Sequence, residues 1–157
     1  MCPSTNHSAE VSRMAKAPTW FISLAVVALL WNLAGIVGVA SDLLLSAADI
    51  KALPPSQQAI YYAQPVWFAF ASVLAVVAGT LGCVAFLLRK RWALIIFYVS
   101  LVGIVAQDIA FIIVARAAGP LGTFPVVLQS CVLIIGIALV VLARIAVRRA
   151  WLTSRVD

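Results

Sequence analysis

The chain has 157 residues, of which 65% are hydrophobic and only 10% charged, and its net charge is +6. A water-soluble domain of this length needs far more polar surface, so the composition excludes one and indicates an integral membrane protein. The basic residues sit at the ends of apolar segments, where lipid head groups lie. No basic patch interleaved with aromatic residues occurs in a polar stretch, which excludes nucleic-acid binding.

Four apolar stretches follow one another along the chain, at residues 19–40, 65–88, 92–115 and 124–147. Each is long enough, as a helix with a rise of about 1.5 Å per residue, to cross a hydrocarbon core of about 30 Å. The predicted fold class is therefore all-α, an integral membrane four-helix bundle. Tryptophan marks the ends of these stretches, as an aromatic belt requires, at Trp20, Trp67, Trp92 and Trp151.

The predicted domain organisation is a four-span transmembrane domain at 19–148 between two tails. We expect residues 1–18 to be a disordered cytoplasmic tail and 149–157 to be a second cytoplasmic tail. The first stretch, with Gly38-Val39-Ala40 before Ser41, also fits a cleavable signal peptide. Its apolar run of about 20 residues exceeds the usual 7–15, which favours a retained span.

Basic residues predict the orientation. If the chain has four spans, nine of them lie on one side: Arg13, Lys16, Arg89, Lys90, Arg91, Arg144, Arg148, Arg149 and Arg155. Only Lys51 and Arg116 lie on the other. Because loops rich in Lys and Arg stay in the cytoplasm, both termini and the Arg89–Arg91 turn are predicted to be cytoplasmic.

The loop between the first two spans is long enough to contain its own structure. Ser46 and Asp49 have the spacing of a capping box, which predicts a short helix from there to about Leu53. Pro54-Pro55 then ends that helix, and a second short helix can begin near Pro55 and carry Tyr61. We expect both helices to be amphipathic and to lie on the outer membrane surface.

The second span carries a stripe of small residues on one helix face: Ala71, Ala75, Ala78, Gly82 and Ala85. Small residues let membrane helices approach closely and gain packing energy. The stripe therefore predicts a helix-packing surface. It can serve packing within the chain or an interface between two copies.

Asp108 is the only acid deep inside a span, where an ionisable group costs about 2.5 kcal/mol or more and often marks a substrate or ion route. Asn32, Gln107, Gln129 and Ser130 share the outer half of the membrane with it. These five residues predict a substrate-binding pocket that opens outward.

Structural roles remain open for the same residues. Asn32 can simply join two helices by a hydrogen bond, and Gln129 can lie close enough to the surface to be wet. Asp108 can be protonated, or it can meet Arg116 through water.

Several chemistries lack the residues they need. The sole histidine, His7, lies in the tail, so two histidines cannot bind haem within the bundle. There is no Cys/His cluster for a metal, no phosphate-binding glycine loop and no nucleophile–base pair. We therefore expect no catalytic residues, no metal and no cofactor, and a protein that is not an enzyme. Small multidrug transporters also have four spans but depend on a glutamate in the first, where this chain has Asn32 and no acid.

Six short segments carry a resemblance to other proteins, at residues 31–35, 52–54, 61–62, 65–67, 79–83 and 87–93. In these segments the chain resembles a family of small, largely uncharacterised bacterial inner-membrane proteins, which often carry an automatic "sugar transporter" label. The resemblance covers about Trp20 to Gln107, implies a bacterial cytoplasmic membrane and carries over no catalytic residues.

Two functions follow as expectations. The first is a transporter or permease of a small polar solute or ion, as a homo-oligomer. The second is an accessory or structural subunit of a larger membrane complex, with the lipid bilayer and a possible homodimer or larger complex as partners.

Overall fold

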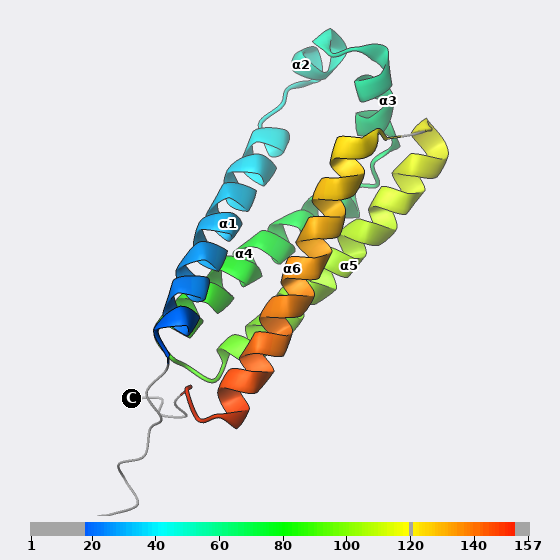
Figure 1. Ribbon diagram of the computed structural model, residues 1–157. Helices are drawn as coiled ribbons and strands as arrows, with labels where there is room; N and C mark the ends of the chain where they lie inside the picture. The colour runs from blue at the N-terminus through cyan, green and yellow to red at the C-terminus, as the bar shows by residue number, and fades with distance from the viewer. Residues whose placement is uncertain (1–17, 120, 153–157) are drawn as a thin grey trace, which may run out of the picture.

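The computed structural model describes residues 18–119 and 121–152, which form six α-helices (Figure 1). They are α1 (Thr19–Leu43), α2 (Ala47–Ala52), α3 (Pro55–Ala63), α4 (Trp67–Leu87), α5 (Ala93–Ala118) and α6 (Thr123–Arg148). By length and composition, α1, α4, α5 and α6 can each cross a membrane. The predicted all-α four-helix fold is confirmed, and the chain is a multi-pass membrane protein. Of the two predicted tails, 1–17 and 153–157 lie outside the described residues.

The four long helices run alongside one another, and α2 and α3 lie together at one end of the bundle (Figure 1). We call this the loop end. The start of α1 and the end of α6 lie at the opposite, terminal end (Figure 1). Helix α1 packs on α4, α4 on α5, and α5 on α6. Within the described ranges, α1 and α6 share no comparable packing, so the bundle is open along that side.

The small-residue stripe of α4 is buried within this single chain, at all five positions. Gly103 of α5 rests against it so closely that a Cβ there would stand 2.8 Å from the backbone nitrogen of Ala75. A Cβ at Gly82 would stand 2.7 Å from the ring of Phe97. The stripe thus brings α4 and α5 into close contact, as small residues do in membrane bundles. This face is not exposed to a second copy of the chain.

The helices α4 and α6 end in the same way at the terminal end. Each has a non-glycine residue with positive φ just past its last turn, Arg89 (φ 56°) and Ala150 (φ 54°). In each, the following N–H bonds the carbonyl five residues back, at 2.9 and 3.0 Å, which defines a Schellman motif. Arg89 Nε also donates to the carbonyl oxygen of Trp151 at 3.0 Å, and this bond ties the two helix ends together.

Aromatic rings fill the terminal end of the bundle. Phe21 of α1 lies 5.1 Å from Phe86 of α4 and 5.5 Å from Trp151, between ring centroids. Phe86 in turn lies 4.7 Å from Phe97 of α5. Because offset and edge-on ring pairs stabilise beyond the area they bury, this cluster holds the terminal ends of α1, α4 and α5 against the chain after α6.

The loop end contains the two short helices that the sequence predicts. Helix α2 begins with the expected capping box: Ser46 Oγ accepts from the N–H of Asp49, and the Asp49 carboxylate accepts from Ser46. These hydrogen bonds hold the pKa of Asp49 below its ordinary value of 3.8. Gln58 of α3 donates to the carbonyls of Lys51 and Leu53, at 3.0 and 2.7 Å, and so joins α3 to the end of α2.

Candidate functional site

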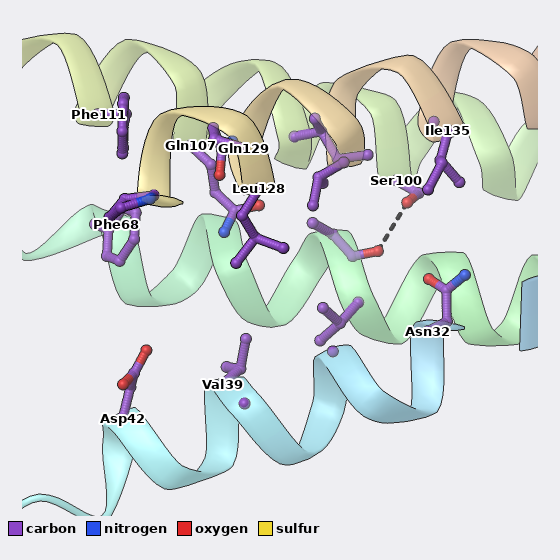
Figure 2. A pocket seen from close by; sticks show the side chains of 18 of the residues that line it. Asn32, Val39, Asp42, Phe68, Ser100, Gln107, Phe111, Leu128, Gln129 and Ile135 are labelled. Carbon is purple, nitrogen blue, oxygen red and sulfur yellow. Dashed lines mark hydrogen bonds between the residues drawn. The ribbon is translucent and has the colours of Figure 1, made fainter. Parts of the chain in front are cut away.

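A cavity of about 540 Å³ lies between α1 and α6 (Figure 2). Residues of α4 and α5 close its inner side, which we call the floor. The floor residues Ala75, Ser100 and Ile104 are buried. Trp31 and Leu128 stand on the α1 and α6 rims and are 39% and 44% exposed. The cavity therefore opens sideways between α1 and α6, toward the bilayer that surrounds the bundle.

Both ends of the cavity are bounded by other parts of the fold. At the loop end, Ile60 of α3 and Gln64 just after α3 line it, and Tyr61 donates a 3.2 Å hydrogen bond to Asp42 at the last turn of α1. Partial burial, and then the negative charge of Asp42, raise the pKa of Tyr61 above its ordinary value of 10.0. At the terminal end, Phe97 of the aromatic cluster lines the cavity. The side opening is thus a route by which a ligand can reach the cavity.

Asn32 lies on the α1 wall, toward the terminal end of the cavity. Its Nδ2 donates to the carbonyl of Ala28 at 2.8 Å and contacts the sulfur of Cys83 at 3.7 Å. Figure 2 shows its oxygen turned toward the rest of the cavity. That oxygen sits over Gly79 of α4, where an added Cβ would come within 2.1 Å of it. Asn32 thus joins α1 to α4 and also faces the cavity.

Gln107 and Gln129 line the same cavity from α5 and α6. Gln107 Nε2 donates to Ser72 Oγ at 2.8 Å, and the Ser72 hydroxyl in turn donates to the carbonyl oxygen of Phe68 at 2.9 Å. Gln129 Nε2 donates to a carboxyl oxygen of Asp108 at 2.7 Å. Each glutamine is therefore held by a neighbouring helix, and both amides are fixed in position at the cavity.

The structure divides the five residues predicted to form one pocket. Asn32, Gln107 and Gln129 line the cavity, whereas Asp108 and Ser130 do not. Consecutive residues on a helix point about 100° apart, so Gln107 faces the cavity while its neighbour Asp108 faces the flank of α6. Ser130 is exposed, and its hydroxyl bonds the carbonyl of Val126 in its own helix at 2.8 Å. The predicted role of these residues in binding stays a prediction.

Three polar lining residues were missed by the sequence reasoning: Asp42, Gln64 and Ser100. Asp42 carried a usable signal, because Asn32, Gly35, Val39 and Asp42 recur at steps of three, four and three on one helix face. Ser100 is buried, and its hydroxyl donates to the carbonyl of Ala75 at 2.7 Å. Gln64 directly follows α3, and it reaches the cavity because α3 packs against α5.

A second hollow lies on the other side of α4 and is lined only by apolar side chains, among them Phe70, Val73 and Val77. It contrasts with the α1–α6 cavity, which alone of the two carries polar groups. Among the described residues, no group of three or more His, Cys, Asp or Glu side chains gathers to hold a metal ion. Comparison of the chain with protein-family models, with curated proteins and with solved structures finds no match. The family resemblance therefore stays a prediction.

Proposed function

We propose that this protein is a small membrane transporter or permease whose solute binds in the cavity between α1 and α6. The observation that carries the proposal is a cavity inside the membrane-spanning bundle that holds the amides of Asn32, Gln107 and Gln129. Polar groups at this depth are costly unless they are paired or serve a ligand, and they often mark a solute route.

A second copy of the chain would line the mouth of the site. Four helices enclose this cavity on three sides, and a second copy packed on the exposed face of α1, the least buried span, would lie beside the opening between α1 and α6 and leave it open to the bilayer. The homo-oligomer is therefore part of the proposal. Its interface differs from the α4 stripe, because the chain itself buries that stripe.

The charge distribution supports an orientation for this transporter. Arg91, Arg144 and Arg148 belong to the terminal end, whereas Lys51 and Arg116 belong to the loop end. Under the positive-inside rule the terminal end faces the cytoplasm, and the loop end of the cavity faces outward. With the family resemblance, we place the protein in a bacterial cytoplasmic membrane with both termini inside.

Blocking the cavity tests the proposal. Gly38 lines the cavity, and no atom lies within 4 Å of a Cβ added there, so Gly38→Phe introduces a ring at the cavity wall from a Cβ that has room. The neighbouring Val37 is 66% exposed and does not line the cavity, so Val37→Phe is the matched control. Uptake into proteoliposomes is measured with a panel of labelled amines, polyols and carboxylates.

The expected result is uptake of at least one solute class above that of empty liposomes. Gly38→Phe abolishes this uptake and Val37→Phe keeps it. Uptake that is equal in both variants, or no uptake of any class, would contradict the proposal.

The second candidate function is an accessory subunit of a larger membrane complex. It is favoured by the exposure of α1, which is the least buried of the four spans. A partner helix could then occupy the opening between α1 and α6. Native mass spectrometry after gentle extraction from the original membrane decides between the two: a stoichiometric foreign partner supports the subunit, and a homo-oligomer or bare chain contradicts it.

A further inference from the structure

The three amides of the cavity are all oriented by acceptors of the protein. Asn32 faces the carbonyl of Ala28, which can only accept. Gln107 faces Ser72 Oγ, whose hydroxyl already donates its hydrogen bond to the carbonyl of Phe68. In both pairs the amide must present its NH₂ group to the protein. Gln129 likewise presents its NH₂ group to the carboxyl group of Asp108.

The amide oxygens are therefore left for a ligand. No group in the described ranges donates a hydrogen bond to the side-chain oxygens of Asn32, Gln107 or Gln129. In those ranges no buried side-chain nitrogen or oxygen lacks a partner either, so these oxygens are accessible rather than sealed in. The hydroxyl of Ser100 already donates its hydrogen bond to the carbonyl of Ala75, so its oxygen can only accept from a ligand. The polar groups of the cavity thus offer acceptors to a ligand.

The charged group of the lining is also suited to a cation, because it is negative. Asp42 stands at the loop end of the cavity, and no Lys, Arg or His is among the described residues that line it. The rest of the wall is largely apolar and includes the rings of Trp31, Phe68 and Phe111. Such a site favours a cation with hydrogen-bond donors and an apolar body, because oxygens and ring faces both attract positive charge. An anion would meet acceptor oxygens and a carboxylate.

The opening between α1 and α6 faces the bilayer, where amphiphilic molecules concentrate. We propose that the ligand of this cavity is an amphiphilic amine, a protonated amino group on an apolar body, which enters sideways from the membrane. This inference names the solute class of the transporter proposed above and rests on that proposal only for the transport step. The amino group lies near the oxygens of Gln107 and Gln129, on the side of the cavity toward Asp42, and the apolar body extends toward Ile135 and Leu139.

A matched set of three probes tests the class directly. 1-Naphthylmethylammonium, 1-naphthylmethanol and 1-naphthoate share one apolar body and differ in the polar group: a cation with donors, a neutral donor and an anion. Binding to the full-length protein in lipid nanodiscs is measured by isothermal titration calorimetry, with empty nanodiscs subtracted for partition into lipid. We expect the ammonium probe to bind at least about tenfold tighter than the carboxylate, with the alcohol between them.

Two variants locate the amino group. Gln107→Met keeps the size of the side chain, removes the acceptor oxygen and leaves Ser72 bonded to Phe68. It should weaken the ammonium and alcohol probes by about five- to tenfold and leave the carboxylate unchanged. Asp42→Asn should weaken the ammonium probe alone, by about threefold, because the Asp42 side chain is exposed at the loop end and its charge is screened there. Ser23→Ala, exposed on α1 outside the cavity, is the control and should change nothing.

Each outcome separates this inference from the transport proposal. Carboxylate binding as tight as ammonium binding, no binding of any probe, or equal effects of Gln107→Met on all three would overturn the amine assignment. A transporter of another solute could still stand in that case. Binding in the expected order without uptake into proteoliposomes would leave the amine site intact and overturn transport.

Discussion

The side-chain oxygen of Asn32 lies directly over the backbone of Gly79, at a position where any side chain on α4 would displace it. The contact joins α1 to α4 at the depth where the cavity begins. Val76, one turn away, makes a looser contact of the same kind, because a Cβ at Gly35 would stand 3.2 Å from it. The wall that carries Asn32 is therefore set by the absence of a side chain at Gly79.

Gly79→Ala should destabilise the fold. The added Cβ would stand 2.1 Å from Asn32 Oδ1, so Asn32 must rotate and lose its bond to Ala28 or its contact with Cys83. Overpacking of this kind lowers the free energy of unfolding by about 1–3 kcal/mol. Thermal unfolding in detergent micelles, followed by circular dichroism, measures the change.

Two further variants make that measurement specific. Gly38→Ala has open space around the new Cβ and should be neutral or stabilising, by up to about 1 kcal/mol, through helix propensity. Asn32→Ala in the Gly79→Ala background should recover part of the loss, since the two residues are in direct contact. Strict additivity of the two changes would show that the contact does not carry the effect.

Ala150→Gly should stabilise the protein. Ala150 has a φ of 54°, and the left-handed conformation costs a residue with a Cβ about 1–2 kcal/mol. Glycine removes that cost but gains entropy in the unfolded chain, so we expect a net increase in the free energy of unfolding of about 0.5–1 kcal/mol. Ala143→Gly, inside α6, is the comparison and should lower it by about 1 kcal/mol. A loss of stability in Ala150→Gly would refute the Schellman end of α6.

The bond between Tyr61 and Asp42 should appear in the pH dependence of the loop end. Because the pKa of Tyr61 is raised in the folded protein, the stabilisation from this residue is present below pH 10.0 and is lost as the pH rises through the folded pKa. Asp42→Asn should lower that pKa only in part, since burial is the larger cause. Ultraviolet titration of the phenolate, with Tyr61→Phe to assign the signal, measures both. An unchanged pKa in Asp42→Asn would show that the two side chains do not interact.

Asp108→Asn separates binding from transport. Asp108 lies beside the cavity rather than in it, and asparagine keeps an oxygen that can accept from Gln129. Folding and probe binding should therefore be retained. We expect uptake to be abolished, because an acid inside a span often serves an ion route and an amide cannot exchange a proton. Unchanged uptake would remove Asp108 from the mechanism.

Most of the fold follows from local rules that the sequence displays. The spans are set by apolar length, and each long helix begins and ends within a few residues of its predicted stretch. The start of α2 follows from the side chains of Ser46 and Asp49 alone. The prediction ended the first span at Ala40, whereas α1 continues to Leu43 and so carries Asp42 onto the cavity face.

The candidate site depends on the rotation of each helix about its axis, which apolar stretches do not reveal. Helix α5 is apolar on nearly every side, so nothing in its pattern distinguishes a cavity-facing Gln107 from a flank-facing Asp108. The rotation is set instead by Gly103 against Ala75, a contact between distant segments. The orientation of the amides, and with it the acceptor character of the cavity, is visible only with Ser72 and Ala28 in place.

The most direct test of the α1–α6 cavity as the solute site is photo-crosslinking in lipid nanodiscs with a diazirine derivative of the naphthylmethylammonium probe, followed by peptide mass spectrometry. We expect labels within residues 31–42 of α1 and 125–139 of α6, and competition by the unmodified ammonium probe but not by the carboxylate. Labels confined to residues of the apolar hollow that do not line the cavity, Phe70, Val73, Leu74, Val77 and Leu81, would contradict this assignment, and so would labelling that the carboxylate competes equally.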